Sequence, residues 1–471
     1  MQHFQISEDN LKKIINHGLD LRADYVDIYM EHTSSTNVNL LPDGENRASQ
    51  NIDYGAGVRY VCGDKTGYAY TEQITPESLL SAMNQAARIH QNVVNVSPRP
   101  YVRPADEQRL SDKVYPTSGF DFQPDSEQIQ QMVLYLKQFR ESLLAADAHI
   151  LHVSGSIRHQ VKRIAIANSL DTLVEETRPL TSVNLQAVIQ QEGQTESANV
   201  SRSYRLPLSM LTPEMQQEMV QDMLRKLHFA LSAKQPKGGE MPVVMGAGAS
   251  GILLHEAIGH AFEADFIRRG ESIFTDKLDK QICSSDITVV DDGLTTDMRG
   301  SIHFDDEGTP AQCTHIVTEG RLTSFLHDRI SAHHFGIAST GNGRRESFRS
   351  MPLPRMRNTF MLNGKEEEQN LIANVKRGIY VTDFTNGQVQ IGAGDYSFFV
   401  KAGYLIENGR LTQPIKDVNV IGNGPETLAD IEAVANNLKI DPSTWMCGKE
   451  GQSCPVSCGM PSVLVKKLTV G

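Results

Sequence analysis

The segment Gly251-Ile-Leu-Leu-His255-Glu256-Ala-Ile-Gly259-His260-Ala-Phe-Glu263-Ala-Asp265 carries two histidines, with Glu256 between them, in a largely apolar run. Neutral imidazoles bind zinc, and a carboxylate beside a metal-bound water can act as its general base. Ionisable groups in apolar surroundings need partners, and a metal ion would provide one. A purely structural role for the histidines is the alternative, because most histidines bind no metal. The segment therefore predicts a metal-dependent hydrolase.

The spacing of the two histidines predicts an irregular helix. Histidines four positions apart share a face, because each residue of an α-helix turns by roughly 100°. His255 and His260 are five positions apart, which separates them by about 140° on a regular helix. A π-type turn with about 4.4 residues per turn would reduce this angle to about 50°. Gly259 would hinder such a turn least, so we expect the distortion around Ala257–Gly259.

Two histidines are too few for a catalytic zinc, which normally has three protein ligands and a water. The third ligand must therefore come from another residue. The candidates lie both beside the motif and farther along the chain: Glu263, Asp265, His303, His315, His327, His333, His334, Cys447, Cys454 and Cys458. Spacing alone does not choose among them.

Composition narrows the class of protein. The 471 residues carry a formal net charge of −12 with no dense Lys/Arg tract, which argues against nucleic acid or an anionic membrane surface as a partner. No run of about 18 apolar residues predicts a membrane span, and no secretory signal is visible. The six cysteines are too few for a disulfide scaffold, so we expect a cytoplasmic location.

Hydrophobic periodicity predicts an α+β fold with two domains. The N-terminal α/β domain, residues 1–235, should combine an antiparallel sheet with helices. Thr-Pro pairs predict two helix starts. The expected helices cover 7–19 and begin near 75, 125 and 212; the expected strands are 25–30, 58–62 and several short ones within 150–205, and a connection covers 95–125.

Gln235–Glu240 is the best linker candidate. After it, helical periodicity becomes rare and strand patterns bounded by Gly and Asp dominate. The C-terminal domain, residues 236–471, is predicted to be β-rich, with a barrel-like sheet that holds the chemistry. Its helices should be confined to the histidine segment, 365–377 and 425–439; strands are expected at 287–293, 314–320 and 404–409, with hairpin turns at Glu319-Gly320 and Asn408-Gly409.

Seven blocks of sequence carry a resemblance to a known family. They are His255-Glu-Ala-Ile-Gly-His260, Phe266-Ile-Arg-Arg-Gly270, Val289-Val-Asp-Asp-Gly293, Asp305-Asp-Glu-Gly-Thr-Pro310, Gly341-Asn-Gly-Arg-Arg-Glu346, Pro352-Leu-Pro-Arg-Met356 and Cys447-Gly-Lys-Glu-Gly-Gln452. Together they resemble the TldD/PmbA family, on its TldD side, over most of residues 245–460. The N-terminal half resembles that of the family in its length and in its general pattern of helices and strands, but its motifs are weaker.

The resemblance implies a zinc-dependent peptidase with one zinc per chain. His255 and His260 would bind the metal, Glu256 would be the catalytic base, and Cys447 would be the third ligand. Cys454 and Cys458 lie outside the family block and are expected to be small buried residues or free thiols. Zn, Mn and Fe can compete for such ligands in cells.

The resemblance also implies partners and substrates. Family members act as dimers, and in some bacteria a TldD chain pairs with a TldE chain to trim leader peptides and to degrade unfolded chains in an enclosed cleft. Homodimer and heterodimer with a PmbA/TldE-like chain both stay open. A non-catalytic, peptide-binding subunit of the PmbA/TldE type is one alternative function, and a zinc hydrolase of non-peptide amides is another.

The expected reaction makes further assignments. Glu256 would take a proton from the metal-bound water and pass it to the leaving amine. Arg344, Arg345 and His315 are candidate donors to the oxyanion. Asp305, Asp306 and Glu307 could orient ligands, but capping of a turn is favoured. An extended peptide would add a strand beside a C-terminal-domain sheet, which predicts loose side-chain specificity.

Overall fold

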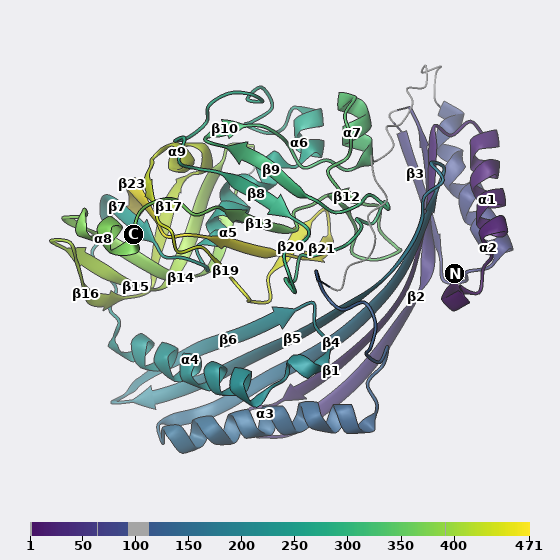
Figure 1. Ribbon diagram of the computed structural model, residues 1–471. Helices are drawn as coiled ribbons and strands as arrows, with labels where there is room; N and C mark the ends of the chain where they lie inside the picture. Colours follow the sequence, from purple (N-terminus) through teal and green to yellow (C-terminus); the bar gives the residue numbers. More distant parts are fainter. Residues whose placement is uncertain (1, 64, 93–112, 391) are drawn as a thin grey trace.

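Six antiparallel strands form a curved sheet in the N-terminal half of the computed structural model, which describes residues 2–63, 65–92, 113–390 and 392–471. Their order across the sheet is β3-β2-β1-β4-β5-β6. Figure 1 shows the sheet bent around one side of the C-terminal domain. The strands are β1 Tyr25–Leu40, β2 Asn46–Cys62, β3 Lys65–Thr71, β4 Ile150–Asn168, β5 Leu173–Gln191 and β6 Gln194–Tyr204.

Four helices cover the convex face of this sheet (Figure 1). They are α1 Glu8–Asp20, α2 Pro76–Ala86, α3 Ser126–Ala146 and α4 Pro213–Ser232, joined by the short 3-10 helices η1 Gln2–Phe4, η2 Ala87–Asn92 and η3 Leu208–Met210. All four predicted helix starts are confirmed. Thr75 and Thr212 cap their helices ahead of a proline, and Asp125 forms a capping box with Gln128. The buried faces of these helices pack on the sheet in two clusters.

The prediction of short strands within 150–205 is wrong. β4 and β5 have 19 residues each and pair along nearly their whole length. Ser154-Gly155-Ser156 has the composition of a turn, yet Gly155 lies inside β4, where an added Cβ would come within 2.6 Å of the Leu185 side chain. Close packing against the neighbouring strand therefore explains this glycine. Of the expected connection at 95–125, residues 95–112 lie outside the described part, and residues 113–125 contain no helix or strand.

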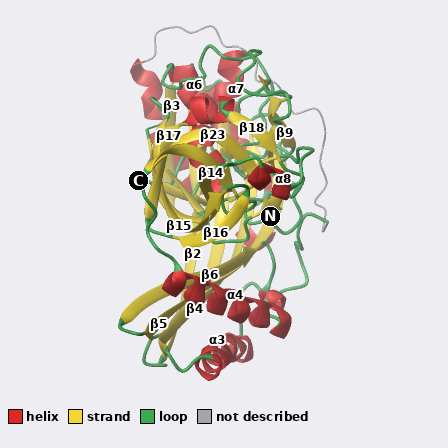
Figure 2. Cartoon of the chain, turned by 90° about the vertical axis from the view of Figure 1, so that its left-hand side faces the viewer, coloured by secondary structure: helices red, strands yellow, loops and turns green. Residues whose placement is uncertain are grey.

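Five strands close a barrel in the C-terminal domain, in the order β14-β7-β23-β17-β15, with β15 paired back to β14. They are β7 Gly239–Met245, β14 Arg377–Val389, β15 Asp395–Glu407, β17 Val418–Asn423 and β23 Val463–Val470; β16 Arg410–Ile415 and β18 Ile431–Val434 pair at its margins. Figure 2 shows these strands above β4, β5 and β6 of the N-terminal sheet and above helices α3 and α4. The predicted α+β class and barrel-like sheet are confirmed.

A second sheet of the C-terminal domain has the order β10-β9-β8-β13-β22-β19. Its strands are β8 Val289–Asp292, β9 Cys313–Thr318, β10 Arg321–Leu322, β13 Asn358–Met361, β19 Lys439–Ile440 and β22 Ser457–Met460; two small hairpin pairs are β11 Gly343–Arg344 with β12 Leu353–Pro354, and β20 Met446–Lys449 with β21 Gln452–Pro455. Both predicted hairpin turns are confirmed. Glu319-Gly320 and Asn408-Gly409 all have positive φ and each connects two paired strands.

The helices of this domain are short: α5 Gly251–Leu254, η4 His255–Gly259, η5 His260–Phe262, α6 Ala264–Arg269, α7 Arg329–Phe335, α8 Glu368–Ala373 and α9 Gly424–Ala429. The predicted helices at 365–377 and 425–439 are too long, because β14 begins at Arg377 and β18 follows α9 directly. α7 was not predicted. Apolar spacing in such short segments does not separate a single helical turn from the strand beside it.

Buried ion pairs cross between the N-terminal sheet and the C-terminal domain. Arg59 of β2 lies 2.6 Å from Glu307, and Arg178 of β5 lies 2.7 Å from Asp306. We propose that the division into domains at residue 235 still describes the chain, since the first sheet ends before it and the barrel begins after it. None of the described helices is long and apolar enough to cross a membrane.

Candidate metal centre

The histidine segment contains the predicted irregular turn. His255–Gly259 forms a π-helix between α5 and the 3-10 turn η5. The turn lies where it was expected, and Gly259 adopts ordinary helical values at its end, with φ of −57° and ψ of −49°. An added Cβ would lie 2.5 Å from Sδ of Met356 and 3.3 Å from the Leu254 carbonyl oxygen. Gly259 is therefore needed for close packing of the π-turn against Met356.

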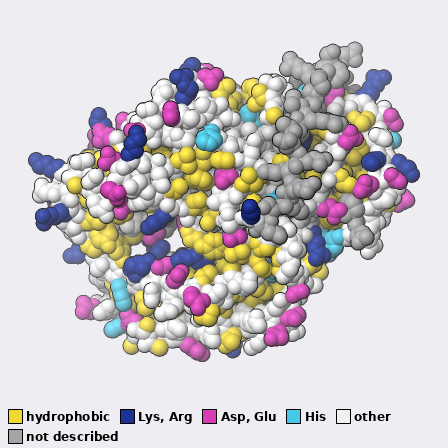
Figure 3. All heavy atoms as spheres, viewed as in Figure 1, with side chains coloured by type: hydrophobic (Ala, Val, Ile, Leu, Met, Phe, Trp, Pro, Cys, Tyr) yellow, Lys and Arg dark blue, Asp and Glu magenta, His cyan; other side chains and the backbone are white. Residues whose placement is uncertain are grey.

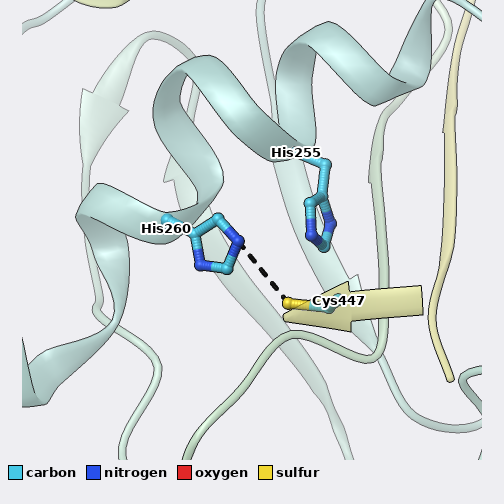
Figure 4. A group of neighbouring side chains, drawn as sticks. All are labelled: His255, His260 and Cys447. Atoms are coloured by element: carbon cyan, nitrogen blue, oxygen red, sulfur yellow. Dashed lines mark hydrogen bonds between the residues drawn. The ribbon is translucent and has the colours of Figure 1, made fainter. Parts of the chain in front are cut away.

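The π-turn directs both imidazoles toward one cysteine of strand β20 (Figure 4). His255, His260 and Cys447 each offer a ligand atom, and these atoms lie within 4.8 Å of one another. Nε2 of His260 is 3.5 Å from Sγ of Cys447. The three residues are 1%, 5% and 1% exposed. Among the described residues, these three side chains form the one cluster of His, Cys, Asp or Glu that could hold a metal ion.

The chemistry of this group fits a metal. Neither ring nitrogen of His255 has a hydrogen-bond partner among the described residues, although buried polar atoms nearly always have one. A metal ion would satisfy one of them. Two ligands of one tetrahedral zinc, with Zn–N of about 2.1 Å and Zn–S of about 2.3 Å, would be about 3.6 Å apart. The separation of 3.5 Å between His260 and Cys447 agrees with that value.

The electrostatics favour a thiolate in this cluster. Burial opposes ionisation of Cys447, but the neighbouring His255 and His260 imidazoles hold its pKa well below the usual value. Burial also opposes a charge on His260, whereas Glu263 and Cys447 raise its pKa well above the usual value. Thiolate and imidazole together are a ligand set typical of zinc.

Comparison with known proteins identifies the family of this chain. Models of the PmbA/TldA metallopeptidase domain 1, central domain and C-terminal domain match residues 26–89, 122–231 and 238–471. A metalloprotease TldD homolog of Haemophilus influenzae is 35% identical over 475 residues, which cover 98% of this chain and 95% of that protein. The chain belongs to the PmbA/TldD metallopeptidase family. Its relatives make it a metallopeptidase, and therefore a hydrolase.

Two further PmbA/TldD proteins extend the comparison. A zinc metalloprotease TldD homolog of Saccharolobus solfataricus is 25% identical over 469 residues, or 98% of this chain and 99% of that protein. The crystal structure of TldE from Thermococcus kodakarensis shares the fold, with a TM-score of 0.75 at 17% identity over 98% of this chain and all of that one. The fold therefore extends across both named branches of the PmbA/TldD family.

Glu256 lies beside the cluster in this PmbA/TldD chain. It is the second residue of the π-turn, and its Oε2 is 3.9 Å from Nε2 of His260. Its side chain is 28% exposed, whereas that of His260 is 7% exposed. Glu256 is thus the carboxylate that both borders the buried cluster and reaches solvent.

Glu263 and Asp265, two of the candidate ligands, lie behind His260. Glu263 Oε2 is 2.9 Å from Nδ1 of His260, on the opposite side of the ring from Cys447. Lys449 donates to both carboxylates. Burial opposes the charge of Glu263, but Lys449 and His260 lower its pKa to about 2. Glu263 therefore supports His260, and Asp265 pairs with Lys449; neither joins the cluster.

The remaining histidine candidates lie apart from the cluster. His303 Nδ1 is 2.8 Å from Glu176, and His327 Nδ1 is 3.3 Å from the Ser331 hydroxyl. His315 and His334 are exposed, and His333 is half-buried in α7. None of these side chains belongs to the group that could hold a metal.

The two other C-terminal cysteines are buried free thiols, as expected. Cys454 lies opposite Cys447 in the β20–β21 hairpin. Burial raises the pKa of Cys454, as it does that of Cys458 in β22. Neither is part of the metal-binding group.

Of the three candidate oxyanion donors, His315 is exposed and away from the cluster, and the two arginines are engaged elsewhere. Arg344 donates to the Met356 and Pro455 carbonyl oxygens, and Arg345 donates to the Tyr68 hydroxyl and the Asp306 carbonyl oxygen. Sequence reasoning missed Arg355, which donates to the carbonyl oxygen of Cys447. The signal for it was its position in one of the blocks that carry the family resemblance, Pro352–Met356.

The acidic run Asp305–Glu307 has two roles. Asp305 caps a turn, as favoured, because its carboxylate accepts hydrogen bonds from the backbone N–H groups of Glu307 and Thr309. Asp306 and Glu307 instead form the ion pairs to Arg178 and Arg59 of the N-terminal sheet. Their role in joining the domains was not predicted.

A cavity of about 680 Å³ lies between the two domains. Figure 3 shows this face of the molecule hollowed between its upper and lower parts, with Lys and Arg side chains at the rim. The lining comes from β6, α4, β14, β15 and the segment that leads into β20: Ser197–Arg202, Asp222, Arg225, Lys226, Phe229, Ala230, Ala249, Thr382–Thr385, Lys401, Ala402, Tyr404, Asp441 and Ser443–Trp445. Trp445 is only two residues before Cys447, so the cavity adjoins strand β20, which carries Cys447.

Proposed function

We propose that this chain is a zinc-dependent peptidase that cleaves extended or unfolded peptides. One zinc per chain would be held by His255, His260 and Cys447. The observation that carries this proposal is the buried convergence of the three side chains, together with the unpartnered ring nitrogens of His255. The zinc metalloprotease of Saccharolobus solfataricus supports zinc as the metal.

Glu256 is the proposed general base. Zinc, when bound, supplies a Lewis acid and lowers the pKa of its water. Glu256 borders the cluster and reaches solvent, so its carboxylate can accept a proton from that water and return it to the leaving amine. Glu263 holds the His260 ring from behind through Nδ1, which leaves Nε2 directed toward Cys447.

We propose that the substrate lies in the cavity between the domains. Strand β6 is the last strand of its sheet and contributes six consecutive residues to the cavity wall. The backbone N–H of Ser203 points away from β5, since it donates to Pro442. Alternation along the strand directs the N–H groups of Ser201, Asn199 and Ser197 the same way.

An edge with such free donors can accept an extended peptide as an added strand. Binding through backbone groups would give loose side-chain specificity. The sequence-based expectation set the added strand beside a C-terminal-domain sheet; β6 offers an edge from the N-terminal sheet within the same cavity.

Glu256→Gln tests the catalytic assignment. The variant keeps the size of the side chain and removes its basicity, so we expect a roughly 100- to 10,000-fold loss of kcat on an unstructured peptide. Its zinc content, measured by mass spectrometry, should match the wild type. The exposed Glu271→Gln is the control and should cleave normally. Wild-type rates in folded, zinc-loaded Glu256→Gln protein would refute the role.

The oligomer is proposed to be a homodimer, or a heterodimer with a PmbA/TldE-like chain, that encloses the cleft. The TldE structure shares the fold of this chain. A non-catalytic, peptide-binding subunit is the competing function. A folded dimer that carries no zinc and binds peptides without cleaving them would favour it. We retain a cytoplasmic location as part of the proposal.

A further inference from the structure

Strand β20 contributes a second side chain to the same face as Cys447. Lys449 is two positions farther along the strand, and alternate residues of a strand share a face. Its side chain is only 4% exposed. A buried ammonium is costly unless each of its donors has an acceptor, so its surroundings indicate what it does.

All three donors of Lys449 are used. Nζ lies 2.7 Å from Oδ1 of Asp265, 3.0 Å from Oε2 of Glu263 and 3.0 Å from the Pro354 carbonyl oxygen. It also lies 4.5 Å from the centroid of the Phe266 ring. The ammonium is therefore held in one position by groups from two separate segments, 263–266 and β12.

Glu263 connects Lys449 to His260. The same oxygen, Oε2, accepts from Lys449 and lies 2.9 Å from Nδ1 of His260. An ionised carboxylate can only accept, so Nδ1 of His260 must carry the hydrogen. When a metal replaces the proton on Nε2, the neutral ring has its lone pair on that atom, which lies 3.5 Å from Cys447 Sγ. Carboxylates that accept from a ligand imidazole in this way fix its tautomer and strengthen it as a ligand.

We propose that Lys449 is a positioning residue of the metal centre, acting through Glu263 on His260. This inference rests on the proposed zinc site. It means that one short strand supplies both a ligand, Cys447, and the cation that orients the ligand facing it. A shift of β20 would change the cysteine and the histidine together.

A double-mutant cycle distinguishes this role from simple packing. Lys449→Met, Glu263→Gln and the double variant are purified without metal, and their zinc affinity is measured by competition with a chromogenic chelator. Each single change should weaken zinc binding by roughly 10- to 100-fold. Because both act along one chain of contacts, the double variant should bind within about twofold of the weaker single variant.

Lys467→Met is the matched control, because Lys467 also pairs with a glutamate, Glu240 at 2.7 Å, but is 57% exposed on β23. It should bind zinc like the wild type. The visible spectrum of the cobalt-loaded protein gives a second readout: Lys449→Met should alter the bands of the bound metal, and Lys467→Met should not.

The outcomes separate this inference from the proposed function. If the wild type binds no zinc, the proposed function is wrong. If the wild type binds zinc and Lys449→Met binds it equally well, or if the losses in the cycle simply add, the inference is wrong. Should Lys449→Met fail to fold, Lys449→Gln replaces it, because its neutral amide is less costly to bury and has only two donors for the three acceptors of Lys449. It should bind zinc more weakly than the wild type, and unchanged affinity would overturn the proposal.

Discussion

Nε2 of His260 lies 3.5 Å from Sγ of Cys447, although 187 positions separate these residues in the chain. His260 begins the 3-10 turn η5, directly after the π-turn, and Cys447 belongs to a small hairpin. Neither element could hold the geometry alone, since the helical segment has only a few residues and the hairpin pairs four with four. The candidate metal centre therefore exists only when the C-terminal domain is folded.

Cys447→Ser should abolish stoichiometric zinc binding, because a serine hydroxyl does not supply a thiolate. Cys454→Ser is a closely matched control: Cys454 is also buried, lies directly opposite in the same hairpin, and is outside the metal-binding group. Zinc content per chain and peptidase activity would be measured for both. Equal zinc content in the two variants would contradict the assignment of Cys447.

Gly259→Ala should destabilise the π-turn, since the new Cβ would meet Sδ of Met356 at 2.5 Å. We expect a loss of about 1–3 kcal/mol in the free energy of unfolding, together with weaker zinc binding. Adding Met356→Ala removes the obstacle, so the cost of the double variant should be less than the sum of the two single costs. Urea unfolding measures all three. Simple additivity would show that the contact with Met356 does not matter.

Glu176 should make stability depend on pH. It is buried, which opposes its charge, but Arg178 and His303 lower its pKa to about 2. The unfolded carboxyl binds its proton at about pH 4.5, so the stabilisation is present above that pH and is lost as the pH falls toward 2. At neutral pH it should be worth about 3 kcal/mol, of which less than half remains at about pH 3.

Unfolding of the wild type and of Glu176→Gln at pH 7 and pH 3 checks this. The variant should be less stable at pH 7, and the gap should narrow at the lower pH. The neighbouring exposed Glu175→Gln is the control and should differ little from the wild type at either pH. If the difference in the free energy of unfolding between the wild type and Glu176→Gln does not change with pH, protonation of Glu176 does not control stability.

Asn199→Pro tests the peptide-binding edge. The N–H of Asn199 is directed into the cavity, away from β5, so proline should remove one donor without breaking the β5–β6 pairing. We expect KM for an unstructured peptide to rise roughly 5- to 10-fold, the cost of one hydrogen bond. Asn199→Ala removes the side chain alone and should leave KM nearly unchanged. If alanine and proline raise KM equally, the backbone is not the recognition element.

Local patterns predicted much of this fold. The helix starts at Thr75, Asp125 and Thr212 follow from side chains that cap within three residues, so they need no knowledge of the rest of the molecule. The π-turn followed from the five-residue spacing of His255 and His260 once both were required to face one ion. In contrast, the full length of β4 could not be predicted locally, because only Leu185 on the neighbouring strand shows why a glycine stands at position 155.

The candidate site was predictable in part. Its two histidines are visible in one short run, whereas Cys447 was chosen among ten candidates by family resemblance and not by spacing. The contacts of Lys449 with Glu263 and Asp265 depend on how a hairpin packs on a helix, and no local pattern encodes that packing. The cavity combines residues from both domains, so it could not be derived from either half.

The ion pairs of Arg59 with Glu307 and of Arg178 with Asp306 limit how this molecule can be divided. A fragment cut near residue 236 would keep the histidines, the cysteine and the barrel, but it would lose the cations that neutralise two buried carboxylates. Removing one partner of a buried ion pair typically costs about 3–5 kcal/mol, which approaches the whole stability of a domain. The C-terminal half, which holds the candidate metal centre, is therefore not an independent folding unit. Transplanting it into another protein would require the N-terminal sheet as well, or other cations in place of its two arginines.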